Sequence, residues 1–132
     1  MFDSIDHVGI AVEEIDGALE TYTGTFGMAL VHRERVPAQG VELAMLAAGH
    51  EHVELVAPLG PDTPVGRFLA ARGPGLHHVA YRVADIDATI ATLRERSVAM
   101  IDETPRAGAL ESRIAFLHPR SAGGVLTEIV QR

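Results

Sequence analysis

The chain repeats itself at a constant spacing of 71 residues. His7 recurs as His78, and Asp16 recurs as Asp87. In both copies the histidine opens a run of alternating apolar residues, and the aspartate stands at the start of a helix-like stretch. Internal similarity of this kind marks a supersecondary unit that buries its apolar face against its copy. The repeat therefore predicts two similar halves that fold together.

The two histidine-bearing runs, residues 5–12 and 76–83, have the period of β-strands. Successive side chains of a strand point to opposite faces of the sheet. One face of each run is apolar, whereas the face that carries the histidine has mostly small or polar residues. We therefore expect the apolar face to pack in a core and the histidine face to line a more open space.

Length and composition exclude several classes of function. A chain of 132 residues with net charge −7 has the size of one domain and lacks the basic cluster that nucleic acid requires. The absence of cysteine excludes disulfides, thiolate nucleophiles and cysteine-bound zinc. Residues 1–4 are not expected to form a signal peptide, and no apolar run is long enough to span a membrane. We expect a cytoplasmic protein that binds neither nucleic acid nor a membrane, with only nitrogen and oxygen as metal ligands.

The periodicity predicts the order strand, helix, strand, strand, strand in the first half. The helix is expected to have Asp16 as its N-cap and an apolar stripe that ends at Gly27. Turn residues separate the later strands. The expected strands of this half are Ile5–Val12, Leu30–Arg35, Val41–Ala47 and His52–Ala57.

A connector helix is predicted between the halves, with Thr63 as its N-cap and Pro64 as its first residue. It ends at the glycines that flank Pro74. The second half then repeats the first, with a helix from Asp87. Its expected strands are Leu76–Val83, Val98–Ile101, Arg113–His118 and Val125–Val130. The prediction is one α+β domain over 1–132, with one βαβββ module at about 1–60, the connector at about 63–72 and the second module at about 75–132.

Each half has one histidine in its first strand and one glutamate in its last, namely His7 with Glu54 and His78 with Glu128. If an approximate two-fold axis relates the halves, these four side chains converge. Two imidazoles and two carboxylates suit a divalent ion such as Co²⁺, Mn²⁺, Fe²⁺, Ni²⁺ or Zn²⁺. A single strand histidine is usually structural, but four symmetric positions with two ligands of each type favour a metal site. Water at open positions would make that metal catalytic.

The remaining histidines have a weaker functional signal. His77 points to the face opposite His78 and is expected to be structural. His52 shares the face of Glu54, which makes it a candidate neighbour of the site. The other three are expected at strand ends or in loops: His32, His50 and His118.

Several motifs resemble a known family. The segment Ile5–Ile10, together with the paired modules and the two glutamates, is similar to the vicinal oxygen chelate superfamily, which includes glyoxalase I and extradiol dioxygenases. The segments Gly75–Ala80, Phe116–Ser121 and Gly123–Glu128 resemble the methylmalonyl-CoA epimerase family within it. The resemblance covers nearly the whole chain. It implies the vicinal oxygen chelate fold, in which two βαβββ modules form a cupped, mixed and mostly antiparallel sheet.

The resemblance also implies an enzyme, an isomerase of the epimerase class that interconverts (2R)- and (2S)-methylmalonyl-CoA. His7, His78 and Glu128 would bind its divalent metal, with Glu54 as a fourth ligand at a position that is glutamine in some relatives. Co²⁺ is the first expectation, with Mn²⁺, Zn²⁺, Ni²⁺ and Fe²⁺ as alternatives. A metal that chelates the thioester and carboxylate oxygens stabilises the enolate formed when the C2 proton leaves. A homodimer is expected by family analogy, and its small-molecule partner is an acyl-CoA.

Epimerisation needs a base on one face of C2 and an acid on the other. Glu128 is the first candidate for one of these catalytic roles. For the second, some relatives have a glutamate at the position of Leu43. This chain has Glu42 one residue earlier, which faces the other side if the strand register is kept. Glu54 and Glu42 both remain candidates, and Glu54 is favoured because glyoxalase I has paired glutamates.

Other functions remain open within the superfamily. An isomerase of the glyoxalase I type or an iron-dependent extradiol dioxygenase could use similar ligands, and a non-catalytic ligand-binding protein could use the same fold. Arginines are needed to bind the anionic coenzyme A, and the sequence does not distinguish between five candidates. These are Arg67, Arg72, Arg106, Arg113 and Arg120.

Overall fold

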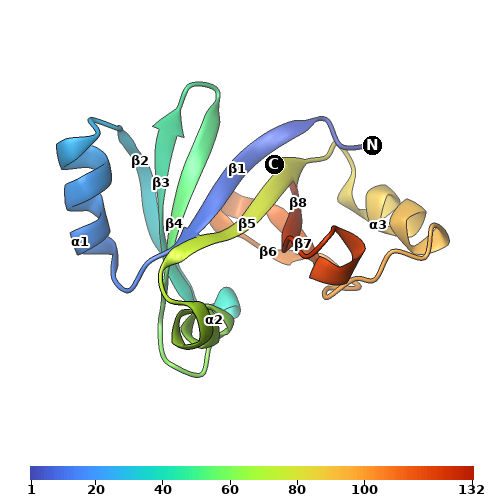
Figure 1. The fold of residues 1–132 in the computed structure, drawn as a ribbon. Helices are drawn as coiled ribbons and strands as arrows, with labels where there is room; N and C mark the ends of the chain where they lie inside the picture. Colours follow the sequence, from blue (N-terminus) through green and yellow to red (C-terminus); the bar gives the residue numbers. More distant parts are fainter. The chain divides into compact units, whose positions relative to one another are not determined.

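The computed structural model describes residues 1–132, which form two compact units (Figure 1). Unit 1 contains Met1–Asp6 and His78–Arg132, and unit 2 contains His7–His77. The division passes through both histidine-bearing strands. Unit 2 begins at His7, and the long segment of unit 1 begins at His78. Both termini of the chain belong to unit 1.

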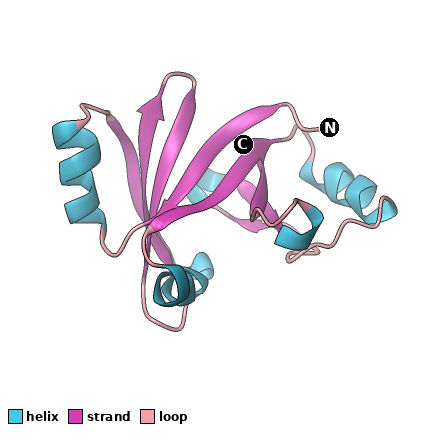
Figure 2. Cartoon of the chain, viewed as in Figure 1, coloured by secondary structure: helices cyan, strands magenta, loops and turns pink.

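The predicted α+β class with two βαβββ modules is confirmed (Figure 2). The strands are β1 (Ser4–Ala11), β2 (Leu30–Val36), β3 (Val41–Ala48), β4 (Glu51–Pro58), β5 (Gly75–Arg82), β6 (Arg106–Ala107), β7 (Arg113–Leu117) and β8 (Thr127–Gln131). The helices are α1 (Ile15–Leu19), its continuation as a π-helix (Glu20–Thr25), α2 (Pro64–Arg72) and α3 (Ile86–Glu95). Short 3₁₀ turns are Pro37–Gln39, Ala109–Glu111 and Pro119–Ser121.

In unit 2 the strands lie in the order β2-β3-β4-β1. β3 is antiparallel to both of its neighbours, and β1 is parallel to β4. Helix α1 covers one face, where Ile15 forms a buried cluster with Ala44 and Leu55. Because side chains alternate along a strand, the neighbouring residues Met45 and Glu54 lie on the other face, directly opposite each other across β3 and β4.

In unit 1 the strands lie in the order β5-β8-β7-β6. β5 is parallel to β8, and the other pairs are antiparallel. Helix α3 packs on one face through Ile86, Ile90 and Leu93, which form a buried cluster with Ile129 of β8. A second apolar cluster, which includes Phe116 of β7, lies apart from the α3 cluster. Each unit therefore has one sheet face that a helix covers and another face that is available for a site.

Helix α2 begins and ends as predicted. The Oγ1 of Thr63 accepts a hydrogen bond from the N–H of Gly66 at 3.1 Å, and Pro64 is the first helical residue. Gly73 follows the last turn with a φ of 73°, which an L side chain adopts only with strain.

The predicted start of α1 is wrong by two residues. Its N-cap is Glu14, whose Oε1 accepts from the N–H of Gly17 at 2.8 Å. α3 also starts one residue before the predicted Asp87, because Asp85 is its N-cap. Both predicted positions, Asp16 and Asp87, lie in the first helical turn, where acidic side chains interact favourably with the helix dipole. Acidic residues cluster at helix starts, so the sequence alone does not single out the cap.

The predicted strand Val98–Ile101 is not formed. Met100 makes only an isolated bridge to Leu117. The carboxylate of Asp102 instead accepts a hydrogen bond from the N–H of Phe116 at 2.9 Å, so a side chain takes the place of a ladder partner. The edge strand here is the two-residue β6, which was not predicted.

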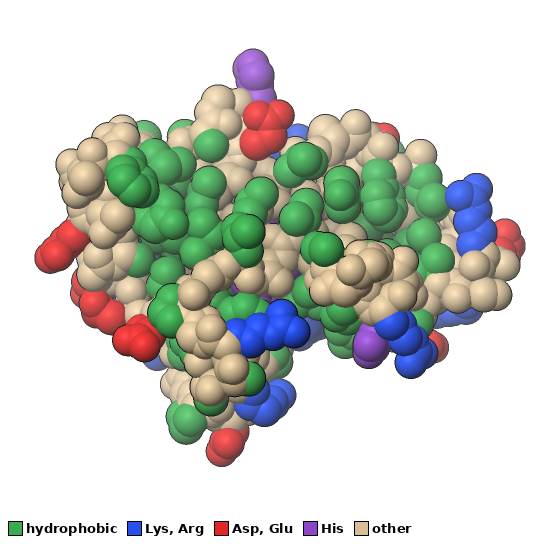
Figure 3. All heavy atoms as spheres, in the orientation of Figure 1, with side chains coloured by type: hydrophobic (Ala, Val, Ile, Leu, Met, Phe, Trp, Pro, Cys, Tyr) green, Lys and Arg blue, Asp and Glu red, His purple; other side chains and the backbone are tan.

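Large apolar side chains are exposed on both units. In unit 2 these include Phe26, Val31 and Leu76, and in unit 1 they include Ile101 and Val125. On the face drawn in Figure 3, green apolar side chains are widespread and basic side chains occur in small separate groups. No helix of the chain combines the length and apolar character that crossing a bilayer requires. Single exposed apolar residues are ordinary on protein surfaces, so they identify no partner by themselves.

We predict that Arg113→Gln raises the pKa of Asp87. The guanidinium donates two hydrogen bonds to this carboxylate, at 2.8 and 3.1 Å, and they lower its pKa from the ordinary value of 3.8. A lowered pKa means that the contact stabilises the fold at neutral pH and that its effect is lost as the pH falls through the folded-state pKa. An NMR pH titration of the carboxyl carbon measures the change. The control Arg96→Gln should leave the pKa of Asp87 unchanged. Equal pKa values of Asp87 in the two variants would contradict the assignment of its lowered pKa to Arg113.

Candidate functional site

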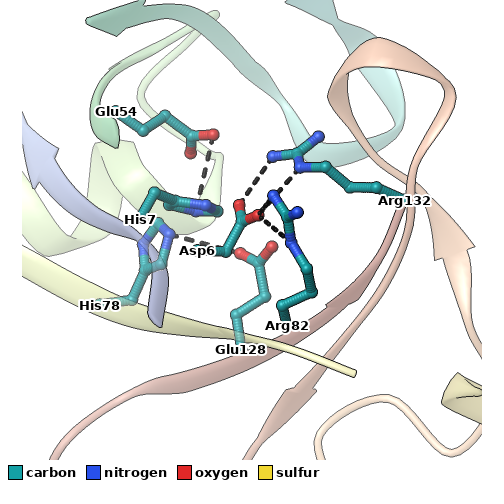
Figure 4. A network of polar contacts seen from close by, with 7 residues as sticks. All are labelled: Asp6, His7, Glu54, His78, Arg82, Glu128 and Arg132. Carbon is teal, nitrogen blue, oxygen red and sulfur yellow. Dashed lines mark hydrogen bonds and ion pairs between the residues drawn. The ribbon is translucent and has the colours of Figure 1, made fainter. Parts of the chain in front are cut away.

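In unit 2, β1 and β4 bring His7 and Glu54 together (Figure 4). The strands are parallel, with His7 opposite His52 and Gly9 opposite Glu54, so both site side chains lie on one face. The Nε2 atom of His7 is 3.6 Å from Oε2 of Glu54. The residues are only 2% and 7% exposed. The opposing position, Gly9, has no side chain, which leaves room beside the glutamate.

In unit 1, β5 and β8 make the equivalent pair. Glu128 lies opposite Ala80, and the Nε2 atom of His78 is 3.3 Å from Oε2 of Glu128 (Figure 4). Both residues are buried. Phe116 of β7 is the cross-strand neighbour of Glu128, and its ring meets the His78 ring edge to face at a centroid distance of 5.6 Å. The aromatic ring limits the movement of the imidazole.

These contacts suit a metal ion. Nitrogen and oxygen ligands lie about 2.0–2.2 Å from a divalent ion such as zinc, so two ligands of one ion are separated by at most about 4.4 Å. The distances of 3.6 and 3.3 Å are within that limit. A buried carboxylate is also costly without a compensating partner. Each pair, His7 with Glu54 and His78 with Glu128, therefore offers donors of the kind that suit a divalent cation.

A buried charged cluster around Asp6 is not evident from the sequence. Its carboxylate is fully buried and accepts hydrogen bonds from Nη2 of Arg82 at 2.7 Å and from Nη2 of Arg132 at 2.7 Å (Figure 4). Asp6 and His7 are both buried although they are neighbours in β1, so the burial does not alternate here. In the sequence, the only indication of this cluster was an aspartate on the strand face that is otherwise apolar.

Glu42 and Leu43 lie on opposite faces of β3, because the strand keeps its register. Leu43 is fully buried. Nε of Arg33 donates a hydrogen bond to Oε2 of Glu42 at 3.3 Å, and Nη1 of Arg33 donates one to Asp16 of α1 at 2.7 Å. These hydrogen bonds raise the pKa of Arg33. Glu42 therefore belongs to an ion-pair network with α1, on the face opposite Glu54.

His52 and His77 are on the faces that the sequence predicts. His52 lies beside His7 in the pairing of β1 with β4, and its Nδ1 atom is buried without a hydrogen-bond partner. The His77 ring packs edge to face against Phe68 of α2 at a centroid distance of 4.9 Å, and burial lowers the pKa of its imidazole. The contact with α2 agrees with a structural role for His77.

Two of the three remaining histidines lie outside strands. His50 is in a turn, and Nδ1 of His118 accepts a hydrogen bond from the N–H of Arg120. His32 instead lies within β2, where its Nε2 is 2.9 Å from Oε1 of Glu34.

The five candidate arginines have different surroundings. One donates to a backbone carbonyl, one lies over a ring of α2, one is paired with Asp87, one donates its backbone N–H to Nδ1 of His118, and one lies over a ring beside His78. These are, in that order, Arg67, Arg72, Arg113, Arg120 and Arg106. Of the five, Arg106 alone stacks on an aromatic ring that also contacts a candidate metal ligand.

Comparisons with known proteins show which proteins the chain resembles in sequence and fold. The family model described as "Glyoxalase/Bleomycin resistance protein/Dioxygenase superfamily" matches residues 6–116. The chain is 32% identical to the ethylmalonyl-CoA/methylmalonyl-CoA epimerase of Cereibacter sphaeroides, over 99% of each chain. It is 41% identical to a structure of a variant methylmalonyl-CoA epimerase of Streptomyces coelicolor with 2-nitronate-propionyl-CoA (TM-score 0.96, covering 99% and 95% of the two chains). A methylmalonyl-CoA epimerase with methylmalonyl-CoA and NH4+ is 40% identical (TM-score 0.95, covering 99% and 95%).

We predict that Asp6→Asn lowers the free energy of unfolding by about 1.5–3 kcal/mol, since it removes charged hydrogen bonds from two arginines. The nearby exposed Asp3 offers a matched control, and Asp3→Asn should change stability by less than about 0.5 kcal/mol. Urea denaturation of both variants measures the difference. Equal effects would mean that the buried cluster contributes no more than a surface charge.

Proposed function

The chain belongs to the methylmalonyl-CoA epimerase family of the glyoxalase, bleomycin resistance protein and dioxygenase superfamily, and we propose that it interconverts (2R)- and (2S)-methylmalonyl-CoA. The observation that carries the proposal is the repeated buried contact between a histidine and a glutamate, His7 with Glu54 and His78 with Glu128. The substrate named for the solved relative supports the choice of acyl-CoA.

We propose that these four residues together bind one divalent cation. All four are buried, and His7, Glu54 and His78 each offer a ligand atom of the type that metals use. Glu128 offers a fourth. When bound, the cation would supply Lewis-acid stabilisation of the negative charge that develops on the substrate oxygens. Co²⁺ is the first expectation, and Mn²⁺, Zn²⁺, Ni²⁺ and Fe²⁺ also suit these ligands.

Glu128 and Glu54 are proposed as the two proton-transfer groups. The C2–H bond of the substrate lies between a thioester and a carboxylate. One glutamate accepts the C2 proton, and the electron pair of the broken bond moves into the thioester carbonyl to form an enolate. The other glutamate, in its protonated form, delivers a proton to the opposite face of C2. The two side chains occupy equivalent positions in β4 and β8, which suits roles that exchange with the direction of the reaction.

Glu42 is the weaker candidate for the second group. Its carboxylate is held by Arg33 on the α1 face of β3, and Leu43 occupies the neighbouring position on the other face. A role for Glu42 would require a local shift in register, whereas β3 pairs continuously with β4 along its length. The continuous pairing therefore favours Glu54.

The central test is deuterium uptake at C2 of methylmalonyl-CoA in D₂O. We expect uptake that is lost with a chelator and restored by Co²⁺, because the charge on the enolate must be stabilised. His78→Ala should lose metal and exchange together, whereas His50→Ala, which changes an exposed turn residue, should retain both. Mass spectrometry and metal analysis provide the readouts. Oxygen consumption with a catechol, turnover of a glutathione hemithioacetal, or ligand binding without exchange would instead indicate the dioxygenase, the glyoxalase I type or the non-catalytic binder.

The second test compares Glu54→Gln with Glu42→Gln. An amide oxygen can still bind a metal but cannot accept the C2 proton, so we expect Glu54→Gln to retain metal and lose about 10²–10⁴-fold in kcat. Glu42→Gln is the matched control and should retain both metal and turnover. Steady-state kinetics with metal analysis measures the two effects. The reverse pattern, with loss only in Glu42→Gln, would assign the second role to Glu42.

The remaining features of the proposal come from the family. A homodimer, a cytoplasmic location and a single folded domain over residues 1–132 stay predictions. Exposed apolar side chains such as Phe26 and Leu76 are compatible with a subunit interface. Sedimentation velocity measures the oligomeric state, fractionation measures the location, and the cooperativity of unfolding measures whether the chain behaves as one domain.

A further inference from the structure

Arg106 lies on the same face of the unit 1 sheet as Glu128. In the pairing of β6 with β7, Arg106 is opposite Ile114. In the pairing of β7 with β8, Ile114 is opposite Val130 and Phe116 is opposite Glu128. Residues that are directly opposite in neighbouring strands project from the same face. The strand pairing therefore places an arginine on the same face as the proposed catalytic glutamate.

The Phe116 ring connects this arginine to the metal-ligand pair. The guanidinium carbon of Arg106 is 5.7 Å from the ring centroid, within the range of a cation–π contact. The imidazole of His78 packs against the same ring edge to face at 5.6 Å. One aromatic side chain thus positions both a permanent positive charge and a candidate metal ligand.

Asp102 fixes the guanidinium from another side. Its Oδ1 is 3.3 Å from Nε of Arg106, and its Oδ2 accepts the hydrogen bond from the N–H of Phe116. The arginine side chain is 35% exposed, so solvent and ligands can reach it. A guanidinium has five N–H donors in a planar fork that matches a carboxylate. Arg106 is therefore held in advance in a position to bind an anion beside the catalytic pair.

We propose that Arg106 binds the free carboxylate of the acyl group and so makes the enzyme selective for acyl-CoA substrates that carry a carboxylate on C2. This inference rests on the proposed function. Methylmalonyl-CoA has two kinds of anionic group, the carboxylate of the acyl group and the phosphates of coenzyme A. The long pantetheine arm separates the phosphates from the thioester. An arginine that shares a ring with His78 therefore meets the acyl end of the substrate.

The test measures binding of two CoA thioesters that differ only in that carboxylate. Isothermal titration calorimetry of the metal-loaded protein uses methylmalonyl-CoA and propionyl-CoA as probes. For Arg106→Gln we expect the Kd of methylmalonyl-CoA to rise about 10- to 100-fold, as for loss of a charged hydrogen-bonded contact, while the Kd of propionyl-CoA changes less than about threefold. Arg106→Lys keeps the charge without the fork and should lie between the wild type and Arg106→Gln.

Arg96→Gln is the matched control, because Arg96 is an exposed arginine at the end of α3 and is not among the candidates for binding coenzyme A. It should change neither Kd. Equal weakening of both probes in Arg106→Gln would overturn the inference in favour of phosphate binding, and unchanged binding of both would exclude a role for Arg106. If Arg106→Gln does not fold, an unchanged selectivity in Arg106→Lys also overturns it. Failure of the proposed function is distinguishable, because it is absence of deuterium exchange in the wild-type enzyme.

Discussion

The structure depends on burying a carboxylate beside an imidazole in each of its two units. Glu54 and Glu128 are nearly removed from water, and each has a histidine within 3.6 Å. Burial of such a group is unfavourable unless a partner compensates for the lost hydration. A bound cation would provide that compensation for both ligand types at once. The same desolvation would strengthen any electrostatic stabilisation of a developing negative charge.

In each unit, the buried polar side chains and the apolar core lie on opposite faces of the sheet. One face of each unit packs on a helix, through Ile15 in unit 2 and through Ile86, Ile90 and Leu93 in unit 1. The other face carries the histidine and the glutamate. Because alternate side chains of a strand point in opposite directions, one strand can contribute to a dry core and to a polar site. Substitutions on the two faces therefore have separable consequences for stability and chemistry.

Much of the fold could be predicted because its signals are local. The repeat, the α+β class, seven of the strands and the cap of α2 at Thr63 follow from short-range patterns, and the family resemblance is confirmed by the comparisons. The N-cap of α1 was wrong because Glu14 and Asp16 both fit a helix start. The segment Val98–Ile101 was wrong because its alternation is ambiguous, and the side chain of Asp102 takes a backbone partner on β7.

The sequence alone predicts His7, Glu54, His78 and Glu128 as site residues, since a repeat places equivalent residues at equivalent positions of its strands. It favoured Glu54 over Glu42 only by analogy with glyoxalase I, and it offered no reason to prefer one arginine. Those choices depend on strand register and on contacts between residues far apart in the chain. Register places Glu42 with Arg33 on the helix face, and the contact with Phe116 brings Arg106 to His78. Tertiary structure decides such questions because a one-residue difference in pairing moves a side chain to the other face of a sheet.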